Sequence, residues 1–509
     1  IPEKSLKSIE NGTFTNFYQK LANKEKNEYE TFTNQELYDL VKNKIKIIEK
    51  QTERRIKMLD LVASINGVLW GPVLLILLCG TGIYYTFRLK FIQVRKFGEA
   101  CKLLFGHIAF KGGERKEGEM TPFQALSTAI AAQVGTGNLA GAATALVMGG
   151  PGAIFWMWIS AFFGMATIYG EATLAQTYKT TTDDGEVTGG PVYYIQAAFK
   201  GTLGKVLATL FAIFIILALG FMGNMVQSNS IGVAFESVFT ARGIAFNPII
   251  VGVILAVFAA FIFIGGTKRL AAVVEKVVPF MAMFYILGSL FVIFMNITEV
   301  PNVLRLIVEC AFNPAAAGGA AVGITIQQAV RYGVARGLFS NEAGMGSTPH
   351  AHARAAAKNP HEQGLVAMLS VFIDTFIVLN MTVFVILTSG VWGSGATGIE
   401  LTQSAFVSVM GGFGDIFVAL CLLFFAGSTI LSWHFFAAVN VKWLFGEAAV
   451  KVYSSIVLIF IVVGSTLKVN LVWELADLFN GLMVFPNLLA LLALSGVVAA
   501  SSKKFDKKN

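Results

Sequence analysis

Eleven apolar segments, each of about 18 residues or more, follow one another between residues 61 and 499 of the 509-residue chain. An α-helix needs a run of that length to cross a bilayer, so each segment is a candidate transmembrane helix. No segment alternates apolar and polar residues as the strands of an outer-membrane barrel do. The sequence therefore predicts an all-α polytopic membrane protein with eleven transmembrane helices. The segments are 61–87, 121–147, 151–178, 203–231, 249–267, 272–297, 320–349, 362–389, 414–439, 449–466 and 470–499.

Composition and motifs exclude the main soluble classes. The chain is 55% hydrophobic and 14% charged, with a mean hydropathy of +0.66. Its formal charge of +8 does not indicate nucleic-acid binding, because the basic residues lie between apolar segments. The four cysteines form no CxxC pair, so neither a disulfide nor a zinc site is expected. Residues 135–141 miss the dinucleotide fingerprint by one position, and HExxH, Walker A and nucleophile-elbow motifs are absent. We expect no enzymatic activity and no organic cofactor.

Lysine and arginine are distributed unevenly between the two sides of the predicted membrane. If residue 121 starts in the cytoplasm, the cytoplasmic loops and tail hold 22 Lys and Arg, whereas the outer loops hold three. Such an excess marks the cytoplasmic side. We therefore expect a multi-pass protein of the cell (inner) membrane, with a basic cytoplasmic tail at residues 500–509.

Residues 1–57 do not share this pattern. They are rich in Lys, Asn and Glu, contain no long apolar run, and carry twelve Lys and Arg that this orientation would place outside. They also lack the features of a signal peptide. The segment is interpreted either as an accessory extension or as the product of an upstream start or fused frame. We favour the second interpretation, in which the working protein begins at Met58.

The apolar segment 121–147 contains the sequence Gly135-Thr136-Gly137 near its middle. Two closely spaced glycines make a membrane helix breakable there. A break is tolerated only where the released N–H and C=O groups face protein or a wet cavity. In transporters, such breaks form the site for substrate and coupling ion.

A second interruption, Gly337–Ser347, lies in the sixth of the ten segments that follow residue 120. The two breaks therefore fall at corresponding positions of two five-helix halves. Paired interruptions of this kind indicate an inverted-repeat transporter, in which core helices 1 and 6 are broken. The predicted parts are a polar extension (1–57), an extra helix and cytoplasmic loop (58–120), two repeats (121–297 and 320–499) and a basic tail (500–509).

The breaks suggest roles for individual residues. The helix that resumes after residues 135–137 offers N–H groups and a positive dipole end, which suit a carboxylate. The half-helix that ends at Ala131–Val134 offers carbonyl oxygens, which suit a hard cation such as sodium. Ser340 and Asn341, the polar residues of the second break, are assigned to the substrate site.

Other polar residues lie inside the apolar segments. Asn224, Gln227 and Ser228 share one helical face, and contact either the substrate or neighbouring helices. Arg336 and Glu342 are candidates for an internal ion pair in the second break. Glu171 and Asp374 are placed near segment ends, where a structural role is expected.

The chain resembles the alanine or glycine:cation symporter family. The resemblance rests on residues 121–141, on Gly337–Ser347 and on Ala351-His352-Ala353, and it runs from about Met58 to the C-terminus. It implies the fold of the bacterial leucine transporter with one extra N-terminal helix. The implied function is sodium-coupled import of a small neutral amino acid, alanine or glycine.

The resemblance also implies a sodium ion that bridges core helices 1 and 8. Ala131 and Val134 match its carbonyl ligands, and Ser428 and Thr429 are the corresponding hydroxyls; back-bonding to their own helix is the alternative for both hydroxyls. Trp433 lies four residues after Thr429, so we expect it on the same face, as a wall of the substrate pocket.

Two other functions remain open at this stage. The first is an amino-acid transporter that is coupled to protons instead of sodium. The second is a channel or passive facilitator, which would not work by alternating access. The expected partners are a small neutral amino acid, sodium and the lipid bilayer, with no nucleic acid, and the expected state is a monomer. The eight predicted substrate residues are Gly135, Thr136, Gly137, Asn224, Gln227, Ser340, Asn341 and Trp433.

Overall fold

The computed structural model describes residues 57–105, 118–182, 185–321, 323–467 and 470–506, together with the isolated residues Asn43 and Lys50. The chain divides into two units, Ile1–Ser64 and Ile65–Asn509. In the first unit, residues 57–64 are helical. The predictions made for residues 1–56, apart from those two isolated positions, lie outside the described residues.

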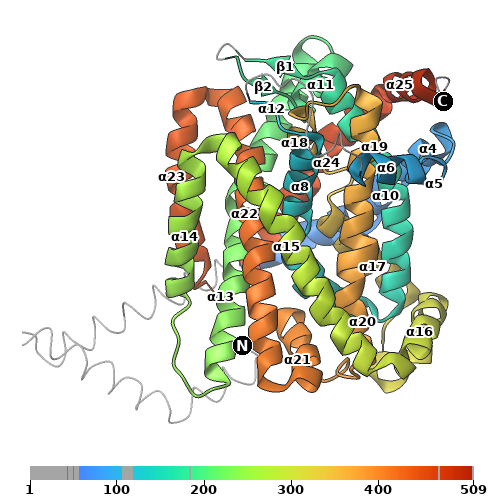
Figure 1. The fold of residues 1–509 in the computed structure, drawn as a ribbon, viewed down its shortest axis with the longest axis vertical. Coiled ribbons are helices and arrows are strands. Elements are labelled where there is room, and N and C mark those ends of the chain that lie inside the picture. The colour runs from blue at the N-terminus through green and yellow to red at the C-terminus, as the bar shows by residue number, and fades with distance from the viewer. Residues whose placement is uncertain are drawn as a thin grey trace, which may run out of the picture. The chain divides into compact units, whose positions relative to one another are not determined.

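In its described residues, the second unit is built almost entirely of helices, with one two-stranded antiparallel hairpin (Figure 1). Its elements in chain order are η2 (Leu69–Val73), α4 (Leu74–Arg88), α5 (Ile92–Arg95), α6 (Phe97–Phe105), α8 (Pro122–Gln133), η3 (Gly137–Gly141), α9 (Ala142–Gly149), α10 (Gly152–Thr177), β1 (Thr180–Thr181), β2 (Val187–Thr188), α11 (Pro191–Ala198), α12 (Thr202–Ile215), η4 (Ile216–Gly223), α13 (Asn224–Thr240), α14 (Ile249–Ile264), α15 (Gly266–Met295), η5 (Ile297–Glu299), α16 (Val300–Phe312), η6 (Pro314–Ala321), α17 (Ile326–Asn341), α18 (Pro349–Ala353), α19 (Pro360–Val371), η7 (Phe372–Leu379), α20 (Asn380–Thr388), α21 (Gly398–Met410), η8 (Gly411–Phe413), α22 (Gly414–Phe445), α23 (Glu447–Gly464), α24 (Asn470–Ala493) and α25 (Ser495–Asp506).

Among the described residues, eight helices are long and apolar enough to cross a membrane, and a bent pair, Pro122–Gln133 with Gly137–Gly149, raises the number to nine. Two of the eleven predicted segments, 249–267 and 320–349, do not form a helix that is long and apolar enough to cross a membrane. Helix α14 has 16 residues, which corresponds to about 24 Å. Helix α17 also has 16 residues and carries Arg331 and Arg336.

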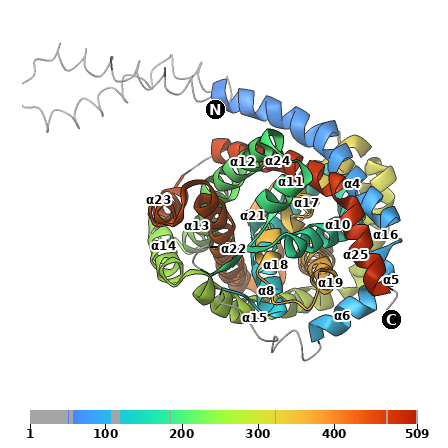
Figure 2. The same cartoon turned by 90° about the horizontal axis from the view of Figure 1, so that it is seen from above.

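The helices differ in how much of their surface is buried. Figure 2 shows α8 and α18 towards the middle of the second unit, with α14, α15 and α23 at its periphery. Peripheral α14 exposes large apolar side chains such as Val257 and Phe261, as expected for a surface in contact with lipid. In contrast, α10 is largely buried and packs against α17 and α19.

The broken helices begin with the same local structure. Thr121 accepts a hydrogen bond from the backbone of Gln124, and the Gln124 side chain accepts one from the backbone of Thr121, which forms a capping box at the start of α8. Thr325 and Gln328 form the same box at the start of α17. Both half-helices therefore start at a position that the sequence defines.

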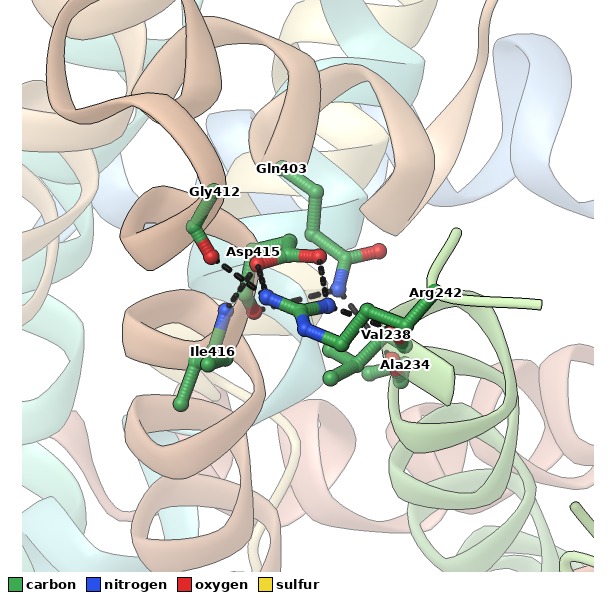
Figure 3. Close-up of polar contacts among 7 residues, drawn as sticks. All are labelled: Ala234, Val238, Arg242, Gln403, Gly412, Asp415 and Ile416. Atoms are coloured by element: carbon green, nitrogen blue, oxygen red, sulfur yellow. Dashed lines mark hydrogen bonds and ion pairs between the residues drawn. The ribbon is translucent and has the colours of Figure 1, made fainter. Parts of the chain in front are cut away.

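A bidentate ion pair joins the end of α13 to the start of α22 (Figure 3). The Arg242 guanidinium donates to Oδ2 of Asp415 at 2.7 Å and to Oδ1 at 3.0 Å. Gln403 of α21 donates to the carbonyls of Ala234 and Asp415 and adds a third helix to the joint (Figure 3). Since α13 and α22 carry the candidate residues Gln227 and Thr429, this joint fixes the two helices that flank the first break.

Candidate functional site

The first break lies where the sequence predicts it. Helix α8 ends at Gln133, and the chain resumes as η3 at Gly137 after a bend of 49°. Within the break, the Gly135 N–H donates to Oδ1 of Asn138 at 3.0 Å, and the Thr136 N–H donates to Oε1 of Gln227 at 3.2 Å. Two of the three backbone donors predicted for a carboxylate therefore already bind side-chain oxygens.

The Thr429 hydroxyl lies between three carbonyl oxygens. Its Oγ1 is 2.9 Å from the carbonyl oxygen of Ala131, 3.0 Å from that of Phe425 and 3.4 Å from that of Val134. A hydroxyl has one hydrogen and can satisfy only one of these acceptors at a time. The remaining oxygen–oxygen contacts suit a small cation, which interacts favourably with every lone pair.

The neighbouring hydroxyl of Ser428 is directed elsewhere. It donates to the Phe425 carbonyl at 2.9 Å and contacts the Met281 sulfur at 3.5 Å. Of the four predicted sodium ligands, the structure thus brings together Ala131, Val134 and Thr429. Ser428 makes the bond to its own helix that was its alternative interpretation. Thr429 contacts both the carbonyls of α8 and that of Phe425 in its own helix.

The two glycines of the first break are closely surrounded. A Cβ atom on Gly135 would lie 2.5 Å from Oγ1 of Thr429 and 3.2 Å from Oε1 of Gln227. A Cβ atom on Gly137 would lie 3.3 Å from the Cα, Cβ and Oγ atoms of Ser340. The glycines therefore allow α13, α17 and α22 to approach the broken backbone closely.

The polar face of α13 is divided between different neighbours. Gln227 contacts the first break, whereas the Ser228 hydroxyl donates to the Ile461 carbonyl of α23 at 2.6 Å. The Asn224 amide donates to the Gly220 carbonyl of its own helix, and its Oδ1 is buried without a hydrogen-bond partner. Gln227 is thus the one residue of the three whose described hydrogen bonds reach the break.

The second interruption begins later than predicted. Gly337 to Asn341 remain helical, and the chain leaves the helix at Glu342, which has a left-handed φ of 56°. The start was predicted too early because Gly337 serves helix packing: a Cβ there would lie 2.8 Å from Cγ of Met157 on α10. Helix α18 resumes at Pro349.

The two breaks contact each other directly. The Gln133 amide, at the end of α8, donates to the Asn341 carbonyl at 2.6 Å. Asn341 in turn donates to Oγ1 of Thr375 at 3.2 Å. Ser340 and Asn341 are therefore buried between the first break and η7.

Glu342 does not pair with Arg336, so that prediction is wrong. Its carboxylate accepts hydrogen bonds from the Trp433 indole at 2.6 Å and the Ser347 hydroxyl at 2.5 Å. Arg336 instead pairs with Asp477 of α24 at 3.3 Å. Trp433 is consequently anchored to the second break and is 2% exposed.

Two buried carboxylates of this region were given too small a role from the sequence. Asp374 is fully buried in η7 at the middle of the helical run Pro360–Thr388, not near its end, and it accepts hydrogen bonds from Asn138 and Ser340. Glu171 is also fully buried and accepts hydrogen bonds from the backbone of Gly344 and Gly346. A lone acidic residue within an apolar segment was the signal that identified both.

A cavity of about 310 Å³ adjoins the first break. Of the eight predicted substrate residues, Thr136 and Gly137 line this cavity, and the other six are buried but do not line it. The ion pair of Arg336 and Asp477 also lines it, together with Phe339.

A bundle of membrane-length helices that is broken beside buried oxygen ligands has the architecture of a secondary transporter. The fold is similar to the crystal structure of MhsT in complex with L-phenylalanine, with a TM-score of 0.55, 14% identity, and coverage of 77% of this chain and 93% of MhsT. Residues 56–509 match the model of the sodium:alanine symporter family, and the chain belongs to that family.

Curated relatives match along nearly their whole length. The sodium/alanine symporter AgcS of Methanococcus maripaludis is 43% identical over 453 residues, which cover 88% of this chain and 97% of AgcS. The probable sodium/glutamine symporter GlnT of Bacillus subtilis is 43% identical and covers 88% and 91%. The putative sodium/proton-dependent alanine carrier protein YrbD of Bacillus subtilis is 39% identical and covers 89% and 93%.

Membership of this family confirms several predictions. The protein is a multi-pass membrane transporter and not an enzyme, it carries amino acids in symport, and sodium is its coupling ion. The leucine-transporter type of fold is confirmed by the similarity to MhsT.

Proposed function

We propose that this protein imports alanine, with glycine as an alternative substrate, by symport with sodium. The observation that carries the proposal is the Thr429 hydroxyl, which lies within 2.9 to 3.4 Å of three carbonyl oxygens at the first break. Similarity to the sodium/alanine symporter AgcS supports alanine, whereas GlnT is named as a probable sodium/glutamine symporter. The restricted space at Gly135 and Gly137 favours a substrate with a small side chain.

In this proposal, sodium lies between the carbonyls of Ala131 and Val134 and the Thr429 hydroxyl. The substrate carboxylate binds the backbone N–H groups of residues 135–137, and its oxygen replaces the Gln227 Oε1 that Thr136 now contacts. Asn224, Ser340, Asn341 and Trp433 complete the substrate site around the second break, with Trp433 held by Glu342.

The proposed architecture has eleven transmembrane helices, of which ten form two inverted repeats at 121–297 and 320–499. The matching capping boxes at Thr121 and Thr325 support the repeat, because they start the first helix of each half in the same way. We further propose a monomer in the cell (inner) membrane with a cytoplasmic C-terminus, on the basis of the Lys and Arg distribution. Residues 58–120 contribute the extra helix and the first cytoplasmic loop, and residues 500–509 the tail; residues 1–57 precede the transporter.

Uptake of radiolabelled alanine into proteoliposomes tests this function. An inward sodium gradient should drive accumulation of alanine above the external concentration, and glycine should compete. A proton gradient alone should not drive it; if it does, the coupling ion is a proton. Internal unlabelled alanine should accelerate exchange, and a lack of that trans-stimulation would indicate a channel or passive facilitator.

Thr429→Val should weaken the apparent affinity for sodium about tenfold or more, which corresponds to about 1.4 kcal/mol. Valine keeps the shape of threonine and removes the one hydroxyl that lies among the carbonyl oxygens. Alanine affinity should recover at saturating sodium, because binding of the two ligands is linked. The measurement is a sodium titration of alanine uptake.

Ser428→Ala is the matched control for this substitution. Its hydroxyl faces the Phe425 carbonyl and Met281, so the sodium titration should stay where it is. If Ser428→Ala moves the titration and Thr429→Val does not, the ligand is the neighbouring hydroxyl. If neither moves it, sodium does not bridge α8 and α22.

A further inference from the structure

The chain turns sharply between α4 and α5, and this corner contains two unusual backbone conformations. Lys90 and Phe91 adopt left-handed φ values of 56° and 55°, which cost free energy for residues other than glycine. Among the described residues, one other non-glycine residue has a positive φ, and that is Glu342 in the second break. Such strain is concentrated at functional sites, so the corner calls for a functional explanation of its own.

The corner is held in place by its buried side. Leu89 is 3% exposed and Ile92 is fully buried. The Gln93 side chain donates to Oγ1 of Thr86 at 2.9 Å and to the Phe162 carbonyl of α10 at 3.4 Å, which fixes α5 against α4 and α10. The exposed residues of the corner are consequently presented in a defined arrangement.

The exposed side of the corner is cationic. Arg88, Lys90 and Arg95 are exposed, and no Asp or Glu occurs between residues 65 and 98. The Arg95 guanidinium donates to the carbonyls of Leu89 and Lys90, at 3.3 and 3.4 Å, which keeps its charge at the turn. The side chains of Arg88 and Lys90 form no ion pair with a described residue.

Several other basic residues on the same predicted side of the membrane have acidic neighbours. Lys179 pairs with Glu119 at 3.3 Å, and Lys442 pairs with Glu447 at 2.6 Å. The excess of Lys and Arg that marks the cytoplasmic side is therefore compatible with local neutralisation. The cations at the corner of α4 and α5 differ, because a neutralising group has to come from outside the described residues.

Exposed apolar side chains lie beside these charges. Phe87 is 63% exposed, Phe91 and Val94 are also exposed, and the two rings meet edge to face with centroids 5.2 Å apart. Phe87 continues an exposed apolar face of α4 that carries Ile76 and Ile83. A transmembrane helix presents such a face to lipid, and Figure 2 shows α4 and α5 at the edge of the second unit. The charges therefore lie where acyl chains end and headgroups begin.

This combination of charges and rings fits a phospholipid with an anionic headgroup. The lipid phosphate accepts hydrogen bonds from guanidinium and ammonium groups, and the acyl chains cover the exposed rings. A zwitterionic headgroup carries its own cation and would leave the charge of the corner uncompensated. An acidic protein in the cytoplasm would meet the charges but not the apolar face of α4, which lies in the membrane.

We propose that the corner of α4 and α5 binds an anionic phospholipid of the cytoplasmic leaflet. Arg88, Lys90 and Arg95 bind its headgroup, and Phe87 and Phe91 contact its acyl chains. The site lies outside the two proposed repeats, so it gives the extra helix a role as a lipid anchor for the transporter. The proposal depends on the proposed orientation for the choice of leaflet, and it does not depend on the substrate or the coupling ion.

Native mass spectrometry of the purified full-length protein, delipidated and then titrated with phosphatidylglycerol or phosphatidylcholine, tests the site. The first phosphatidylglycerol should bind about tenfold more tightly than the first phosphatidylcholine, and the double substitution Arg88→Gln/Lys90→Gln should remove that preference. Lys200→Gln/Lys205→Gln is the matched control, because it also removes two exposed lysine or arginine charges on the same predicted side. The control should keep the preference.

Lys90→Gly separates binding from folding. Glycine adopts a φ of 56° without strain, so the midpoint of thermal unfolding in detergent should not fall, whereas phosphatidylglycerol should bind about fivefold more weakly. Equal affinity for the two lipids, or a preference that survives the substitutions at Arg88 and Lys90, would overturn the proposal. An equal loss of preference in the control would also overturn it, since general surface charge would then explain the binding. Displacement of phosphatidylglycerol by inorganic phosphate at equal concentration would show a site for a free anion and contradict the lipid assignment.

Discussion

Gly135→Ala is expected to weaken the sodium dependence of alanine uptake strongly, while the protein still inserts and folds. The new Cβ atom would lie 2.5 Å from Oγ1 of Thr429, well inside van der Waals contact, and 3.2 Å from Oε1 of Gln227. Thr429 is β-branched and has few alternative rotamers, so it must move away from the carbonyls of Ala131 and Val134. Overpacking of this kind costs about 1–3 kcal/mol. Here it would displace the Thr429 hydroxyl from the carbonyl oxygens that are the other proposed sodium ligands.

The measurement is a sodium titration of uptake in proteoliposomes, with an expected loss of sodium affinity of more than about tenfold. Gly427→Ala is the matched control, because it lies two residues before Thr429 on the same helix. A Cβ atom there meets only Cδ2 of Leu255, at 3.9 Å. The control should transport normally, whereas a normal sodium titration for Gly135→Ala would show that sodium does not bind at this break.

The positions of the breaks were predictable because they depend on local sequence. Gly135 and Gly137 interrupt an apolar segment that is otherwise helical, and the residues of the capping box at Thr121 define its start. Thr429 was predictable only through the resemblance to a family. The start of the second break was predicted too early, because Gly337 is required by the packing of α17 on α10 and not by a turn.

The partners of buried polar residues were not predictable in the same way. Arg336 and Glu342 are close in sequence, yet each binds a residue of another helix, Asp477 and Trp433 respectively. The sequence also does not reveal which neighbour each side of α13 meets, and Gln227 and Ser228, adjacent in the chain, contact different elements. Such pairings are decided by the arrangement of helices, which periodicity does not encode.

Asp374 shows the same limit more sharply. From the sequence, it was expected near a segment end, with a structural role. In the structure, it lies in the π-helix η7, a distortion that often accompanies functional sites. Two of its hydrogen-bond donors, Asn138 and Ser340, are more than thirty positions away in the chain, and the third, Thr375, is directly adjacent. No local sequence pattern could therefore predict this set of partners.

Glu171→Gln is expected to destabilise the second break and to abolish amino-acid binding. The Gly344 N–H donates to Oε2 of Glu171 at 3.0 Å, and the Gly346 N–H donates to Oε1 at 2.9 Å. Asn487 also donates to Oε1, at 2.7 Å, and its orientation is fixed because its own Oδ1 accepts from Tyr194. Every hydrogen-bond partner described for the carboxylate is thus a donor.

A glutamine offers one oxygen and one NH₂ group, so at least one of these donors would face another donor. A buried N–H without an acceptor costs about 1–3 kcal/mol. Gly344 and Gly346 adopt φ values of 86° and 82°, which glycine reaches without strain, and in this conformation both N–H groups donate to the carboxylate. We therefore expect a lower midpoint of thermal unfolding and faster amide hydrogen exchange for residues 342–348.

Glu309→Gln, at an exposed position of α16, makes the same chemical change without such donors and should alter neither measurement. The substitution at Glu171 should leave sodium binding at Thr429 measurable, because that site lies at the first break. Unchanged exchange at residues 342–348, together with unchanged alanine affinity, would show that the second break holds its shape without Glu171. The carboxylate would then have no role in presenting Ser340, Asn341 and Glu342 to the site.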